Sequence, residues 1–281
     1  MTDGSFRVLA AGIGFTEGPL WLPSGDILVT SMSRGLLYEV PLAATAEAPL
    51  RSFETGGGPN GLASSADGLV VVAQNGGASF QSRSPRPVKP GIQVLRDGLV
   101  FDELVTGCLA PNDLVFAPDG TLWFTDPGHP ADPDFAPRVS RYDFATGALD
   151  TVVEGVRFPN GLAFGPDGDF YLADSDSDDI LRFTVSSEGL SDRRVFANVT
   201  AGGPDGIAFD ANGFLYVAAF DTDDIAVFDP EGTLVRRLPT GEKSRPTNLC
   251  FAGDELDTLV VTLASGGRVI AFDEQFEGAQ P

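Results

Sequence analysis

The segment at 158–168 reads Phe158-Pro159-Asn160-Gly161-Leu162-Ala163-Phe164, followed by Gly165-Pro166-Asp167-Gly168. Similar segments recur every 42 to 52 residues, and each has a polar residue, a short apolar run and a turn glycine. In five copies the polar residue precedes that glycine by eight positions. The polar residues of these copies are Glu17, Asn60, Asn112, Asn160 and Asp205, and Thr247 opens a weaker sixth copy. The sequence is therefore a set of repeats.

Each repeat has the pattern of four short strands. In the repeat that starts at Asn112, apolar runs at 114–116, 122–125, 139–144 and 149–154 are separated by glycine-containing turns or a polar loop, as in antiparallel strands. Four strands in 42 to 52 residues are typical of a propeller blade. Six repeats predict an all-β fold, a six-bladed β-propeller with four antiparallel strands per blade, and we expect residues 1–281 to form a single domain.

The two ends of the chain predict how the ring closes. The last repeat supplies only three strands, at about 249–251, 258–263 and 268–272, whereas residues 5–10 form one strand in excess. We expect the N-terminal strand to complete the last blade, because closure shields strand edges that would otherwise pair with other chains. Strands alternate in direction, so the polar residues of the repeats should share one mouth of the central channel. The long loops 75–91 and 126–138 should partly cover that mouth.

Composition narrows the classes of partner. The formal charge of −22 at pH 7 argues against nucleic acid and anionic membranes, because both are polyanions. No apolar run reaches the roughly 20 residues that a membrane span needs. Cys108 and Cys250 are the two cysteines, and residues 1–15 lack the pattern of a signal segment. These features predict a cytoplasmic protein.

The polar residues of the repeats have the chemistry of a metal site. Glu17, Asn112, Asn160 and Asp205 offer only oxygen donors, and two of these side chains are anionic. Such donors suit Ca²⁺, Mg²⁺ or Mn²⁺. Two carboxylates that converge on an apolar channel would repel each other unless a cation lay between them. The alternative is that these residues only cap the starts of strands, where Asn and Asp are common.

Four motifs surround these residues, namely Phe15-Thr16-Glu17-Gly18-Pro19-Leu20-Trp21, Pro111-Asn112-Asp113, Pro159-Asn160-Gly161-Leu162-Ala163 and Pro204-Asp205-Gly206. Together they resemble the gluconolactonase/regucalcin family, which is related to squid-type diisopropylfluorophosphatase. The resemblance covers nearly the whole chain. It implies a six-bladed propeller with one catalytic divalent cation, with Ca²⁺ as first choice and Mg²⁺, Mn²⁺ or Zn²⁺ as alternatives.

The resemblance also implies roles for individual residues. Glu17, Asn160 and Asp205 match metal ligands of the family. Asn112 matches an asparagine that contacts substrate in the lactonases and metal in the phosphatase. Asp205 in addition matches the proposed general base.

The expected reaction is hydrolysis of a small lactone to the open hydroxy acid. A cation in an open site would polarise the ester carbonyl and stabilise the oxyanion, and Asp205 could accept a proton from the attacking water. Asn112 and Asn60 are candidate substrate-binding residues, and so is His129, the single histidine, in a loop of the same mouth. Strand capping for Asn60 and a plain surface position for His129 remain open.

Other functions also remain open. The sugar lactonases often have an arginine two residues before the asparagine matched by Asn112, and here that residue is Ala110, which makes an apolar or aromatic lactone a candidate substrate. A phosphotriester or phosphonofluoridate hydrolase on the same scaffold is one alternative. A non-enzymatic propeller that binds calcium or a partner is another. The acidic run at 174–179 lacks the glycine and distal glutamate of an EF-hand loop, so we expect a solvated loop there.

Overall fold

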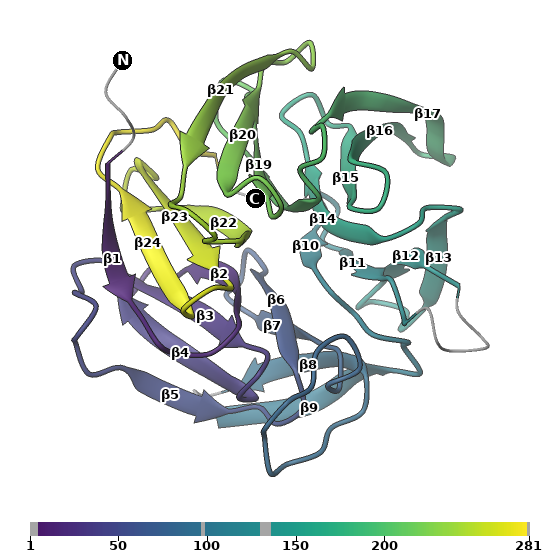
Figure 1. Cartoon of the computed structure of the whole chain (residues 1–281). Coiled ribbons are helices and arrows are strands. Elements are labelled where there is room, and N and C mark those ends of the chain that lie inside the picture. The colour runs from purple at the N-terminus through teal and green to yellow at the C-terminus, as the bar shows by residue number, and fades with distance from the viewer. Residues whose placement is uncertain (1–4, 97–98, 130–135, 280–281) are drawn as a thin grey trace.

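The ring of blades is visible in the computed structural model, which describes residues 5–96, 99–129 and 136–279. Six four-stranded antiparallel sheets lie around a central axis (Figure 1). The predicted six-bladed propeller is confirmed. None of the described residues forms a helix that could cross a membrane.

The blades follow one another along the chain. Blade one holds β2 (Thr16–Trp21), β3 (Asp26–Ser31), β4 (Leu36–Pro41) and β5 (Arg51–Glu54), and blade two holds β6 (Pro59–Ser64), β7 (Val70–Gln74), β8 (Gly91–Arg96) and β9 (Leu99–Thr106). Blade three holds β10 (Leu114–Phe116), β11 (Leu122–Asp126), β12 (Arg138–Tyr142) and β13 (Leu149–Glu154), and blade four holds β14 (Pro159–Phe164), β15 (Phe170–Asp174), β16 (Asp179–Ser186) and β17 (Gly189–Asn198). Blade five holds β18 (Pro204–Phe209), β19 (Leu215–Ala219), β20 (Asp224–Phe228) and β21 (Leu234–Pro239), and blade six holds β22 (Pro246–Ala252), β23 (Thr258–Leu263), β24 (Arg268–Phe272) and β1 (Phe6–Ala10).

Both ends of the chain help to close the ring. Strand β1 pairs antiparallel with β24, so that Phe6 lies opposite Phe272, and blade six has the order β1-β24-β23-β22. This confirms the predicted closure. The segment after β24 adds a second connection between blades five and six, which was not predicted from the sequence. The ring of Phe276 packs against Phe251 of blade six and Tyr216 of blade five, and the Ala211 amide of blade five donates to the Glu277 carbonyl at 2.7 Å.

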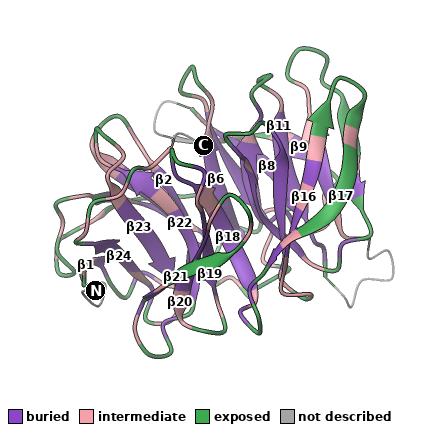
Figure 2. Cartoon of the chain, turned by 90° about the horizontal axis from the view of Figure 1, so that it is seen from above, coloured by how far each residue is buried: buried purple, intermediate pink, exposed green. Residues whose placement is uncertain are grey.

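The core lies between neighbouring blades. Trp123 of β11, for example, packs on Phe164 and Phe170 of the next blade with ring centroids 5.3 and 4.9 Å apart. Figure 2 shows buried residues along the inner strands, and exposed residues along much of the outer strands β17 and β21. Each blade therefore buries its two faces against its neighbours, which leaves the channel and its mouths for polar side chains.

A glycine beside the polar residue lets adjacent inner strands approach closely. A Cβ atom on Gly161 would collide with the Asp205 carbonyl and with the Cα of Gly206. The same residue type follows the polar residue in four of the six repeats, as Gly18, Gly61, Gly161 and Gly206. The two exceptions are Asp113 in blade three and Asn248 in blade six, where a polar side chain stands in this position.

Candidate active site

The inner strands carry the predicted polar residues to one mouth of the channel. These strands all run in the same direction through the ring, so their first residues share one end. Glu17 lies in β2, Asn60 in β6, Asn160 in β14 and Asp205 in β18, whereas Asn112 lies two residues before the start of β10. All five side chains are buried, with 9% or less of each residue exposed. Buried polar groups of this kind need partners.

Glu17 and Asp205 interact electrostatically although they come from blades one and five. Burial raises the pKa of Glu17 well above its usual value, and the negative charges of Asp205 and Asp113 raise it further. Burial likewise raises the pKa of Asp205 well above its usual value, and Asp113 adds to this increase. The mouth thus concentrates negative charge that a bound cation would compensate.

Asp113 is a third buried carboxylate at this mouth, and the sequence analysis did not assign it to the site. Its Oδ1 accepts a hydrogen bond from the Leu114 amide at 2.9 Å, and its Oδ2 accepts one from Asn248 Nδ2 at 3.2 Å. Burial raises its pKa to about 6. The sequence signal that could have revealed it is the missing glycine, because Asp113 stands where four repeats have Gly.

Two buried amide oxygens at the mouth are free to accept a ligand. Asn160 Nδ2 donates to Ser175 Oγ at 3.1 Å, and that hydroxyl donates to the Pro204 carbonyl at 2.6 Å. This chain orients the amide, yet Asn160 Oδ1 has no hydrogen-bond partner among the described residues. The same holds for Asn60 Oδ1. A buried acceptor without a partner is costly, so an oxygen-seeking cation fits Asn160 Oδ1, and a hydrogen-bond donor of a substrate fits Asn60 Oδ1.

The donor set at the mouth is mixed rather than purely acidic. Among the residues that the structure describes, no three His, Cys, Asp or Glu side chains form a metal-binding group. The predicted set instead combines two carboxylates, Glu17 and Asp205, with the amides of Asn112 and Asn160. Carboxylate and amide oxygens together are usual ligands of hard divalent cations.

Side chains at the ends of second strands hold the backbone that leads into the site. Asp126, at the end of β11, accepts from the Ala110 amide at 2.7 Å and is paired with Arg138 at 2.9 Å. Asp174, at the end of β15, accepts from the Phe158 amide at 2.9 Å. These bonds lie two residues before Asn112 and Asn160. They fix the point at which each asparagine enters the channel.

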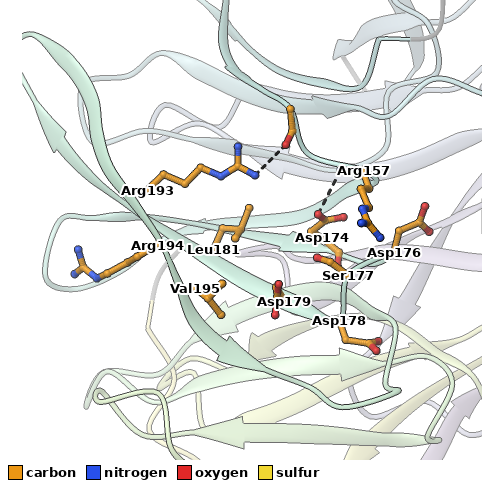
Figure 3. Close-up of a pocket in the computed structure, with 11 residues that line it drawn as sticks. Arg157, Asp174, Asp176, Ser177, Asp178, Asp179, Leu181, Arg193, Arg194 and Val195 are labelled. Carbon is orange, nitrogen blue, oxygen red and sulfur yellow. Dashed lines mark hydrogen bonds between the residues drawn. The ribbon is translucent and has the colours of Figure 1, made fainter.

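The acidic run at 174–179 is not a solvated loop throughout, because Asp174 ends β15 and Asp179 begins β16. Asp174 is a buried residue at the end of β15 and not part of a solvated loop, because it binds the backbone of the segment before β14. Asp176, by contrast, is exposed. All of the run except Ser175 lines a pocket together with Arg157 and Arg193 (Figure 3), and the volume of this pocket is about 650 Å³. None of the predicted site residues lines this cavity.

The two long loops of the mouth are described to different extents. The loop at 75–91 packs against blade one, where the Arg83 amide donates to the Ser33 carbonyl at 2.8 Å and the Phe80 ring lies 4.9 Å from that of Phe15. His129 is exposed. The residues that follow it, 130–135, lie outside the described part of the chain, so the expected cover from 126–138 and the role of His129 stay predictions.

Comparison with known proteins settles the family. A model of the SMP-30/gluconolactonase/LRE-like region matches residues 5–265. The chain belongs to this family. No protein of curated function matches the chain by sequence.

Several solved structures have the same architecture as this chain. A gluconolactonase from Xanthomonas campestris is 26% identical, with a TM-score of 0.82 over 98% of this chain and 90% of the other. A calcium-binding protein, regucalcin, from Agrobacterium tumefaciens is 20% identical, with a TM-score of 0.81 over 98% and 96%. A luciferin-regenerating enzyme is 17% identical, with a TM-score of 0.80 over 99% of both chains. At these identities, the last two establish the fold alone.

Proposed function

We propose that this member of the SMP-30/gluconolactonase/LRE-like family is a divalent-metal-dependent lactonase that hydrolyses a small lactone to the hydroxy acid. The observation that carries the proposal is the pair of buried carboxylates, Glu17 and Asp205, beside the unpartnered oxygen of Asn160. Membership of the family and similarity to a gluconolactonase support the reaction class. Ca²⁺ is the first candidate because the donors are hard oxygens, and a related structure is described as calcium-binding.

Glu17, Asn160 and Asp205 would hold the cation, with Asn112 as a fourth donor. The bound cation supplies Lewis acidity, which polarises the lactone carbonyl and stabilises the charge that develops on its oxygen. Asp205 accepts a proton from the attacking water, directly or through a second water. Asn112 and Asn60 hydrogen-bond the lactone and orient its carbonyl.

Two features of the mouth favour an apolar or aromatic lactone. Ala110 is fully buried and carries no charge to hold an acidic or polyhydroxy group. Phe80 is 43% exposed, and its ring packs at a tilt against that of Phe15, two residues before Glu17. An exposed aromatic ring beside the site would gain from contact with an apolar substrate.

A substrate panel tests the proposal directly. We expect acid release from at least one lactone, faster for aliphatic and aromatic lactones than for sugar lactones, and lost after exhaustive chelation. A pH-indicator assay over lactones and phosphotriesters, with and without chelator, measures this. If the protein hydrolysed phosphotriesters but no lactone, we would conclude that it is a phosphotriester hydrolase and not a lactonase. Stoichiometric calcium binding without turnover of any substrate would indicate a binding propeller.

The ligand set can be tested by cation content. Glu17→Gln removes a charged ligand, so we expect it to retain less Ca²⁺ than the unaltered chain. Asn60→Ala serves as the matched control, because it removes a buried polar side chain at the equivalent position of the next blade. Elemental analysis after dialysis gives the calcium content of each variant. Equal calcium content in the two variants would contradict the proposed ligands.

A further inference from the structure

A hydrogen bond crosses the channel between opposite blades. Asn248 Nδ2, in β22 of blade six, donates to Asp113 Oδ2, at the start of blade three, at 3.2 Å. The two residues are 135 positions apart in the sequence. Each is only 8% exposed. In a ring of six, blades three and six face each other, so this pair spans the axis of the propeller.

Each partner is also held by its own strand. The Leu114 amide donates to Asp113 Oδ1 at 2.9 Å, and the Leu249 amide donates to Asn248 Oδ1 at 2.8 Å. Both oxygens of the Asp113 carboxylate therefore have protein donors. These two donors fix the position of the carboxylate.

Glycines in the neighbouring blades make room for the bridge. A Cβ atom on Gly61 would collide with Asp113 Oδ1, and one on Gly206 would collide with Asn248 Oδ1. The bridge therefore fills the space that the glycine positions leave at the axis. Asp113 also acts electrostatically on both Glu17 and Asp205, and Asn248 interacts with the Glu17 carboxylate.

We propose that the Asp113–Asn248 bridge is the floor of the site and that the charge of Asp113 sets the cation affinity of Glu17 and Asp205. This inference rests on the proposed function. Asp113 acts through space as a positioning residue, because the Leu114 amide and Asn248 hold its carboxylate at the axis. Because these carboxylates are buried, a third negative charge near the cation adds attraction that solvent screens only weakly.

The make-up of the pair agrees with this role. Two aspartates in these places would repel each other across the axis, and two asparagines would keep a hydrogen bond but supply no charge. One aspartate and one asparagine give both a bridge and a single negative charge. A pair with asparagine at position 113 and aspartate at position 248 would also have the hydrogen bond and the single negative charge. This exchange therefore tests the proposal.

Calorimetric titration with Ca²⁺, after removal of bound metal from the full chain, measures the affinity. We expect Asp113→Asn to bind Ca²⁺ at least about tenfold more weakly, which corresponds to about 1.4 kcal/mol. The swap variant, Asp113→Asn with Asn248→Asp, returns the charge to the opposite side of the bridge and should recover most of the affinity. Asp210→Asn removes a buried carboxylate at the far end of β18 and should bind Ca²⁺ like the unaltered chain.

The outcomes separate this inference from the proposed function. Unchanged affinity in folded Asp113→Asn, or a swap variant as weak as Asp113→Asn, would overturn the role of the charge. If Asp113→Asn does not fold, the swap variant decides alone, because its affinity must then be close to that of the unaltered chain. Absence of any cation binding in the unaltered chain would overturn both this inference and the proposed function. Tight Ca²⁺ binding that depends on Asp113, without turnover of any substrate, would support this inference and contradict the proposed lactonase activity.

Discussion

Asp205→Asn is expected to leave the propeller folded and to lower lactone turnover by about 10²- to 10⁴-fold, the usual contribution of a general base. Asparagine keeps an oxygen for the cation but cannot accept the proton of the attacking water. It also removes one of the mutually repelling negative charges at the mouth, so the metal-free variant should be at least as stable as the unaltered protein. Turnover number, Ca²⁺ affinity and melting temperature should be measured on the same preparation.

The matched control for this variant lies on the same strand. Asp210 directly follows β18, is 5% exposed and accepts the amides of Asn212 and Phe214 at 2.9 Å each. It lies five residues from Asp205, about 16 Å along an extended strand. Asparagine can keep both of these hydrogen bonds through its amide oxygen, so Asp210→Asn should stay folded and leave the turnover number unchanged. Near-normal turnover in Asp205→Asn would show that another group is the base.

Removal of the cation is expected to lower the melting temperature at neutral pH by about 5 to 10 °C. A ligand at one hundred times its dissociation constant stabilises the folded state by about 2.7 kcal/mol, and in a domain of this size each kcal/mol shifts the melting temperature by about 2 to 4 °C. The buried carboxylates at the mouth would then repel one another without compensation. Scanning calorimetry with Ca²⁺ or with chelator measures the difference.

This effect should depend on pH in a defined direction. The folded-state pKa of Asp113 is raised to about 6, and the pKa values of Glu17 and Asp205 are raised well above their usual range. A raised carboxyl pKa stabilises the metal-free protein fully below the unfolded value of about 4, and this stability is lost as the pH rises through the folded value. The metal-free protein should therefore lose stability from about pH 4 upward, through pH 6.

Bound Ca²⁺ should oppose that loss, because it compensates the ionised carboxylates. The gap in melting temperature between the calcium and chelator samples should therefore be wider at pH 7.5 than at pH 5. A melting temperature that does not respond to Ca²⁺ at either pH would contradict a cation site at the mouth. The Asp113→Asn variant should lose part of the pH dependence around pH 6.

The sequence by itself determined the architecture. Turn glycines, short apolar runs and a repeat of 42 to 52 residues are local signals, and five of the six blades form from strands that follow one another in the chain. The missing strand of the last repeat also predicted that β1 would pair with β24. These features could be derived because they depend on neighbours in the chain and on strand counting, not on side chains that meet across the ring.

The tertiary structure alone decided how the polar residues meet. The bridge from Asn248 to Asp113, the interaction of Glu17 with Asp205, and the contact of Phe276 with Tyr216 each join residues from different blades. Such contacts exist only when the ring is closed, and their separation along the chain carries no periodic signal. Burial, which raises the pKa values of the carboxylates, likewise follows from the packing of all six blades around one axis.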